Sequence, residues 1–284
     1  MPLEMYDSNK SSSGVQHVIA IAAGKGGVGK STITVNIALA LKQQGYAVGI
    51  LDADIYGPSV RMMLPEDRMP SQKGESIMPA LCQGIRMISM AYFRKEHEAA
   101  AVRAPIANNV INQFIKQVNW GPLDFLLIDF PPGTGDIQLT LSQQASLTGA
   151  VMVTTPQEIS LLDVRKAIHL FQQVQIPVIG VIENMSYFLD PVTQHKHYLF
   201  GKDGGSKLAQ ESGVPLLGNI PIDPVIGQCG DEGVSLFAKA HVAQSTLTSF
   251  SETANKIAKH AHALKENAHQ ALSQFELIWK EMTV

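Results

Sequence analysis

The clearest chemistry in this 284-residue chain lies in a glycine-rich segment that follows an apolar run. Residues 24–31 read GKGGVGKS and fit the pattern G-x-x-x-x-G-K-[ST], which predicts a phosphate-binding loop. Glycines let successive backbone N–H groups point at phosphate oxygens, and a following helix adds the partial positive charge of its N-terminus. We expect Lys30 to reach the β- and γ-phosphates and the Ser31 hydroxyl to bind Mg²⁺. The expected nucleotide-binding residues are Gly24, Lys25, Gly26, Gly27, Val28, Gly29, Lys30, Ser31 and Thr32.

Other charged residues fit the needs of a bound nucleotide and its metal ion. Lys25 lies inside the loop, where a cation can act on the charge that develops during phosphoryl transfer. Asp129 ends an apolar run, which is typical of a carboxylate that holds Mg²⁺, and the Pro/Gly-rich stretch 130–136 predicts a switch loop. Asp52 and Asp54 follow another apolar run, and a loop-capping role is the alternative for each.

The phosphate-loop residues and the aspartates can lie close together only if the strands before them end at the same edge of a sheet. Short apolar runs, many of them rich in β-branched residues, each end at a turn or loop signal, which is typical of parallel strands buried on both faces. Apolar spacing predicts helices over 31–44 and 158–175. The alternation predicts an α/β fold with a doubly wound, mostly parallel sheet and helices on both faces. The predicted strands are 18–23, 47–52, 85–90, 125–129, 150–155, 178–183 and 215–220.

The chain divides into three expected parts. Residues 1–16 are Ser-rich and predict a flexible N-terminal tail, and 17–240 predict one P-loop ATPase domain in which 65–76 is the best candidate for a flexible loop. Residues 241–284 predict an amphipathic helical extension of one or two helices, because apolar residues recur at spacings of mostly three and four. We expect its apolar stripe to pack against the domain or another subunit.

Composition and charge exclude several classes of protein. The 22 Lys+Arg and 25 Asp+Glu residues give a net charge of −3, which argues against a nucleic-acid partner. Cys82 and Cys229 cannot form a disulfide framework, and the chain has no CxxC. The start of the chain has no apolar signal segment, and no apolar run is long enough for a membrane helix. We expect a cytoplasmic protein with no membrane partner.

The chain resembles the Mrp-type ATPases, iron–sulfur cluster carriers of the deviant Walker A P-loop group that also includes MinD/ParA and the nitrogenase iron protein. The resemblance spans about residues 15–240, some four-fifths of the chain. It implies an ATPase that uses ATP and Mg²⁺, opens and closes as a homodimer, and works with iron–sulfur scaffold or client apoproteins. It rests on GKGGVGKST (24–32), LDADIYGPS (51–59), DFPPGTGDIQLTL (129–141), TTPQEISLLDVRKA (154–167), ENMSYF (183–188) and GDEG (230–233).

The resemblance also implies roles for single residues. Lys25 would cross the dimer to the partner's phosphates, and Asp54 would orient the attacking water. Asp129 would hold Mg²⁺ through water. Asn184 would contact the adenine, with help from the loop that contains Pro221 and Asp223.

One segment departs from the family pattern. The two positions of the family's CxxC, whose cysteines hold a [4Fe–4S] cluster between two subunits, are occupied by Asp190 and Thr193. Iron–sulfur clusters require thiolate ligands, which neither side chain supplies. A metal site that includes His195 and His197 is an alternative, and a structural or surface role for these histidines is favoured over it.

Three hypotheses follow from these observations. The first is an ATPase of the Mrp family that takes part in iron–sulfur cluster assembly or transfer. The second is a nucleotide-gated dimeric interaction switch without a cluster. The third, ranked lower, is a MinD/ParA-type positioning ATPase, which would need a basic terminal helix or face that the sequence lacks.

Overall fold

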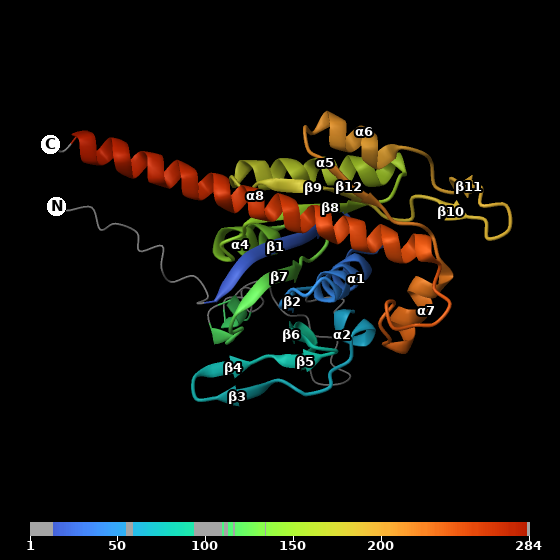
Figure 1. Cartoon of the computed structure of the whole chain (residues 1–284), viewed down its shortest axis with the longest axis horizontal. Helices are drawn as coiled ribbons and strands as arrows, with labels where there is room; N and C mark the ends of the chain where they lie inside the picture. The colour runs from blue at the N-terminus through green and yellow to red at the C-terminus, as the bar shows by residue number, and fades with distance from the viewer. Residues whose placement is uncertain are drawn as a thin grey trace.

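Strands and helices alternate along much of the chain (Figure 1). The computed structural model describes residues 14–54, 59–93, 110, 113–115, 117–133 and 135–282, with the backbone alone for 136, 269 and 271–282. The strands are β1 (Val15–Ala23), β2 (Val48–Asp52), β3 (Ser71–Lys73), β4 (Ser76–Met78), β5 (Ala80–Cys82), β6 (Ile85–Ser89), β7 (Leu123–Asp129), β8 (Gly149–Thr154), β9 (Val178–Glu183), β10 (Phe188–Leu189), β11 (Lys196–His197) and β12 (Leu216–Asn219). The helices are α1 (Lys30–Gln43), α2 (Val60–Met63), the 3₁₀ helix η2 (Met90–Phe93), α4 (Asp136–Gln144), α5 (Glu158–Gln173), α6 (Gly204–Glu211), α7 (Pro224–Glu232) and α8 (Gln244–Met282).

The central sheet has eight strands in the order β12-β9-β8-β1-β7-β2-β6-β5. All neighbours are parallel except β5, which runs antiparallel to β6 at one edge. The chain runs from β1 out to β2 and β6, returns through β7, and continues on the other side of β1. Such a reversal of strand order opens a ligand-binding crevice at the carboxyl ends of the strands. The predicted fold class is confirmed, and every predicted strand belongs to this sheet.

Helices cover both faces of the sheet, so its central strands are apolar on both sides. Alternate residues of β1 show this: Ile19 and Ile21 lie in the core beneath α1 and α8, while Ala20 and Ala22 lie in the core beneath α4, α5 and α6. Figure 1 shows α1 and α8 on one face, with α5 and α6 on the other. The two cores fix β1, and therefore the loop that follows it.

The two predicted helices agree with the structure to within two residues at each end. Helix α1 begins at Lys30, one residue before the prediction, because Gly29 at its N-cap adopts a left-handed conformation with φ of +82°. It ends before Gly45, whose φ of +91° suits the C-terminal side of a helix. Lys30 and Ser31 therefore lie in the first turn of a helix that is buried along most of its length.

Two expectations need correction. Strand β1 begins at Val15, so residues 15 and 16 belong to the sheet rather than to the expected tail, and residues 1–13 lie outside the described part. The expected loop 65–76 contains β3 and the first residue of β4, which form a short antiparallel hairpin. Strands of three residues are too short to show an alternating pattern, which is why the sequence did not predict them.

The C-terminal extension is a single helix, α8, of 39 residues. Its first half buries Phe250, Ala254, Ile257 and Ala261 in the same core as α1 and β12. Its far end extends past the sheet in Figure 1. None of the described helices is long and apolar enough to cross a membrane.

Candidate nucleotide-binding site

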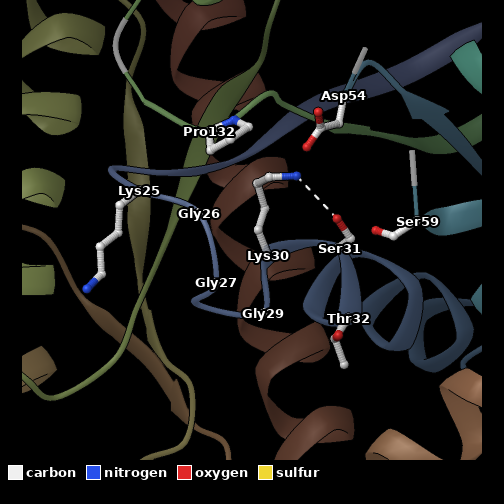
Figure 2. A pocket seen from close by; sticks show the side chains of 10 residues that line it. All are labelled: Lys25, Gly26, Gly27, Gly29, Lys30, Ser31, Thr32, Asp54, Ser59 and Pro132. Carbon is white, nitrogen blue, oxygen red and sulfur yellow. Dashed lines mark hydrogen bonds between the residues drawn. The ribbon is translucent and has the colours of Figure 1, made fainter. Parts of the chain in front are cut away.

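The loop between β1 and α1 forms one wall of a pocket of about 260 Å³ at the carboxyl edge of the sheet (Figure 2). It brings together most of the predicted loop residues and Asp54, which follows β2. Ser59 and Pro132 also line it; Pro132 belongs to the predicted switch loop 130–136, whereas no role was predicted for Ser59. Gly24 and Val28 do not line it. The lining residues are Lys25, Gly26, Gly27, Gly29, Lys30, Ser31, Thr32, Asp54, Ser59 and Pro132.

The conformation and packing of the loop require glycine at several positions. Gly27 and Gly29 both have φ of +82°, a region that side chains rarely adopt. A Cβ atom on Gly29 would lie 2.3 Å from Asn184 Nδ2, and one on Gly24 would lie 2.2 Å from the backbone of Asp163 in α5. The motif therefore requires glycine both because of the backbone conformation of the loop and because of its close contacts with α5 and Asn184.

Asp129 lies at the centre of the polar network at the floor of the pocket. Its Oδ2 accepts hydrogen bonds from Ser31 Oγ at 2.7 Å and forms an ion pair with Lys30 Nζ at 2.8 Å. Its Oδ1 accepts a hydrogen bond from Thr34 Oγ1 at 2.7 Å. Asp129 is fully buried and Lys30 is 7% exposed, so the lysine charge compensates a carboxylate that would otherwise be costly to bury.

Asp52 lies beside Asp129 on the paired strand β2. Its Oδ2 accepts a hydrogen bond from Ser89 Oγ at 2.7 Å, and its Oδ1 accepts one from the backbone N–H of Asp54 at 3.2 Å. Burial, followed by the neighbouring charge of Asp129, raises the pKa of Asp52 to about 7. Asp52 thus holds a proton more readily than an ordinary aspartate. It also caps its loop, which was the alternative role.

The two lysines of the loop have different orientations. Lys30 Nζ lies inside the pocket, 3.3 Å from Ser31 Oγ. Figure 2 shows the Lys25 side chain pointing away from Lys30, Ser31 and Asp54. In a single copy of the chain, Lys25 therefore does not face the place where its own loop would hold the terminal phosphates.

Asn184 contacts the outer side of the loop. Its Nδ2 donates a hydrogen bond to the carbonyl oxygen of Val28 at 2.9 Å, and the residue is 6% exposed. Asp223 caps α7 through the N–H of Val225 and accepts a hydrogen bond from Thr246 Oγ1 in α8 at 2.6 Å. Pro221 is buried. The adenine contacts implied for Asn184, Pro221 and Asp223 stay predictions, and each of these residues also has a structural role.

The donor set beside Lys30 fits Mg²⁺. A hydroxyl and a carboxylate oxygen lie 2.7 Å apart, on Ser31 and Asp129, and Mg²⁺ prefers such oxygen ligands. An anionic carboxylate that already pairs with one cation can accept another when the lysine moves to phosphate oxygens.

The residues at the family's cluster position do not fit an iron–sulfur cluster. Asp190 lies between β10 and β11, and its Oδ1 accepts hydrogen bonds from the backbone N–H groups of Val192 at 2.8 Å and Thr193 at 2.7 Å. These bonds lower the pKa of Asp190 and make it a turn-capping residue. Cys82 and Cys229 are buried, and burial raises the pKa of the Cys82 thiol to about 12. Among the described residues, no group of three or more His, Cys, Asp and Glu side chains is placed to hold a metal ion.

Comparisons with known proteins match the chain to P-loop NTPases. Residues 14–258 match the ParA family model described as "NUBPL iron-transfer P-loop NTPase". A protein named iron-sulfur cluster carrier protein from Synechocystis sp. is 49% identical over 228 residues, which cover 78% of this chain and 65% of that protein. One of the same name from Aquifex aeolicus is 45% identical over 229 residues, covering 80% of this chain and 63% of the relative. The chain therefore spans a little under two thirds of the length of these curated relatives.

Solved structures show the same fold. A nucleotide-binding protein from Archaeoglobus fulgidus in complex with ADP is 40% identical, with a TM-score of 0.68 over 77% of this chain and 87% of that one. The septum site-determining protein MinD from Pyrococcus horikoshii, complexed with Mg-ADP, has a TM-score of 0.62 over 88% of this chain and 98% of that one. At 22% identity, the MinD likeness shows the fold alone.

Proposed function

The chain belongs to the ParA family of P-loop NTPases, in the group described as NUBPL iron-transfer P-loop NTPases, and we propose that it is a Mg²⁺-dependent ATPase. We assign it a part in assembling iron–sulfur clusters or transferring them to target apoproteins, as the names of its relatives support. The observation that carries the ATPase proposal is the contact of Lys30 and Ser31, which line the pocket, with the buried carboxylate of Asp129. The proposed compartment is the cytoplasm, where reducing conditions keep thiols unpaired.

In the proposed mechanism, each residue of the pocket has a distinct task. The glycines of the loop direct backbone N–H groups at the phosphates, and Lys30 turns from Asp129 to the β- and γ-phosphates. Ser31 and Asp129 would hold Mg²⁺, and the ion would supply positive charge against the phosphates. Asp54 orients the attacking water. Lys25 of a second copy stabilises the charge that develops on the phosphates.

Nucleotide binding is tested by replacing Lys30. We expect Lys30→Met to abolish ATP binding in isothermal titration calorimetry, because the phosphates lose the cation at the centre of the pocket. Lys42→Met is the matched control: Lys42 lies at the other end of α1 and donates to the carbonyl of Gln83. Unchanged ATP binding by Lys30→Met would refute the proposed site.

A second function, a cluster-free dimeric interaction switch, is favoured by one specific observation. Asp190 and Thr193 form a hydrogen-bonded turn at the positions of the family's thiolate ligands. In this alternative, ATP binding and hydrolysis would gate the binding of a client protein, and any cluster would be held by a partner. The MinD-type positioning alternative has no such observation, because the MinD likeness shows the fold alone.

Anaerobic reconstitution with iron and sulfide distinguishes the two functions. If the chain is a cluster-free switch, it should bind no cluster, and the double variant Asp190→Cys/Thr193→Cys should gain iron, sulfide and a visible charge-transfer band. The variant Cys82→Ala/Cys229→Ala is the control for adventitious thiols. A band in the natural chain that survives this control would overturn the switch and support direct cluster carriage.

A further inference from the structure

A buried hydroxyl outside the phosphate-loop motif contacts Asp129. Thr34 lies one helical turn after Lys30 in α1 and is fully buried. Its Oγ1 lies 2.7 Å from Asp129 Oδ1 and 3.1 Å from the carbonyl oxygen of Lys30. A helical threonine commonly donates to the carbonyl four residues before it. A hydroxyl has one proton, however, and an ionised carboxylate at the shorter distance is the stronger acceptor, so the proton is donated to Asp129.

This contact gives the two oxygens of Asp129 different roles. Oδ1 is held by Thr34, which is fully buried and does not line the pocket. Oδ2 accepts a hydrogen bond from Ser31 and pairs with Lys30, and both of these residues line the pocket. Nucleotide binding would draw Lys30 to phosphate oxygens, whereas nothing in the pocket competes for Thr34. The Thr34 contact is therefore the one that can persist while Oδ2 exchanges one cation for another.

We propose that Thr34 is a positioning residue that fixes the Asp129 carboxylate so that Oδ2 stays beside Ser31 and Lys30, where Mg²⁺ would be held. The inference rests on the proposed Mg²⁺-dependent nucleotide site and adds a residue to it. Fixing the carboxylate matters here because Asp52 lies beside Asp129 on the adjacent strand. Repulsion between the two carboxylates would otherwise favour other rotamers of Asp129 and lower the population that is ready to bind the cation.

The test compares Thr34→Val, which keeps the shape and removes the hydroxyl, with Thr34→Ser, which keeps the hydroxyl. The readout is the affinity for a slowly hydrolysed ATP analogue, measured by calorimetry as Mg²⁺ is varied and in excess chelator. We expect Thr34→Val to raise the Mg²⁺ concentration needed for tight binding by about 10- to 100-fold, the usual effect of losing a hydrogen bond to a charged group. Affinity in chelator should not change, and Thr34→Ser should restore the natural Mg²⁺ dependence.

Thr253→Val is the matched control. Thr253 is a buried threonine of α8 whose hydroxyl donates to the carbonyl four residues before it and to no carboxylate. Its variant should keep the natural Mg²⁺ dependence.

Three outcomes would overturn the inference: an unchanged Mg²⁺ dependence in Thr34→Val, an equal loss of affinity with and without Mg²⁺, or the same shift in Thr253→Val. If Thr34→Val does not fold, Thr34→Ala replaces it under the same criteria. Failure of the natural chain to bind the analogue would instead refute the proposed function itself.

Discussion

Two buried aspartates at the end of adjacent strands have different chemical environments. Asp129 pairs with Lys30, whereas Asp52 has hydroxyl and backbone N–H donors and a raised pKa of about 7. In the proposed site, Asp129, the carboxylate with the cationic partner, would exchange that partner for Mg²⁺. Asp52 caps its own loop, and it repels Asp129 whenever its carboxylate is ionised.

Asp52→Asn tests this division. The folded chain keeps the Asp52 proton up to about pH 7, whereas an unfolded chain loses it near the ordinary aspartate pKa of 3.8. The proton's contribution to the free energy of unfolding is therefore present at low pH and is lost as pH rises through about 7. Near pH 8 we expect Asp52→Asn to melt at least about 3 °C higher than the natural chain, the shift that roughly 1 kcal/mol produces in a domain of this size. Differential scanning calorimetry at about pH 5 should show a smaller difference. A difference that is equal or larger at low pH would contradict the assignment.

Lys25→Ala tests the role of the second lysine of the loop. Since the Lys25 side chain points away from Lys30 and Ser31, its loss should leave ATP binding intact (Figure 2). Hydrolysis should fall by at least ~10³-fold, the usual effect of removing a charge clamp in phosphoryl transfer. Phosphate release under single-turnover conditions measures the step. Full turnover by Lys25→Ala would refute a role across a dimer.

The residues of the site were predictable to different degrees. Lys30, Ser31 and Asp129 follow from a local motif and from the end of an apolar strand, and the structure brings them together. Thr34 and Ser89 were missed, because a hydroxyl that contacts a carboxylate across tens of residues leaves no spacing signal. Their contacts depend on which strands are neighbours in the sheet. The sequence predicted the fold class but not this strand order.

At the scale of elements, a histidine pair joins β1 to α8. His17 Nε2 lies 2.9 Å from His262 Nδ1, and the His17 ring stacks on Phe125. Burial, followed by the nearby charges of His262 and Lys265, lowers the pKa of His17 to about 4, while Asp124 opposes this shift. His17 is therefore neutral when the chain is folded at neutral pH.

His17→Gln tests this contact through pH. An unfolded chain protonates His17 near pH 6.5 and the folded chain near pH 4, so folding stability falls as pH is lowered through that range. For the natural chain, we expect His17 to contribute a loss of about 2 kcal/mol in unfolding free energy between about pH 7 and pH 5. Urea titrations of His17→Gln should show a loss smaller by that amount. The exposed control His169→Gln should retain the natural slope, and an unchanged slope in His17→Gln would contradict the account.

The length of an element decided whether the sequence predicted it. The seven longer apolar runs all became strands of the central sheet, because burial on both faces leaves a continuous signal. The hairpin of β3 and β4 and the antiparallel strand β5 were missed at three residues each. The periodic apolar residues of the C-terminal stretch correctly predicted helix but did not decide between one helix and two. The stretch forms one helix.

At the scale of the whole molecule, one group of exposed apolar side chains is a candidate for the surface that the proposed homodimer would bury. Val192, Leu199 and Phe200 are exposed on and after the β10–β11 hairpin, and Ile159 and Leu162 are exposed on the first turns of α5. Gly24 of the phosphate loop packs against α5, so this surface adjoins the loop that carries Lys25.

Leu199→Glu tests the proposed homodimer. A slowly hydrolysed ATP analogue should convert the natural chain to a dimer in sedimentation velocity, and Leu199→Glu should remain a monomer, since a buried unpaired charge is costly. Met69→Glu is the matched control, because Met69 is exposed on the segment that leads to β3. Strand β3 lies away from the β10–β11 hairpin (Figure 1). A monomer with the analogue, or equal dimer formation by Leu199→Glu, would contradict this arrangement.

The most direct test of the central claim is the release of phosphate from ATP by the intact chain, with Mg²⁺ and with excess chelator. The account predicts steady release that depends on Mg²⁺ and is lost in Lys30→Met, because the proposed site of the chemistry is the group of Lys30, Ser31 and Asp129. No release by the natural chain, or equal release by Lys30→Met, would contradict it.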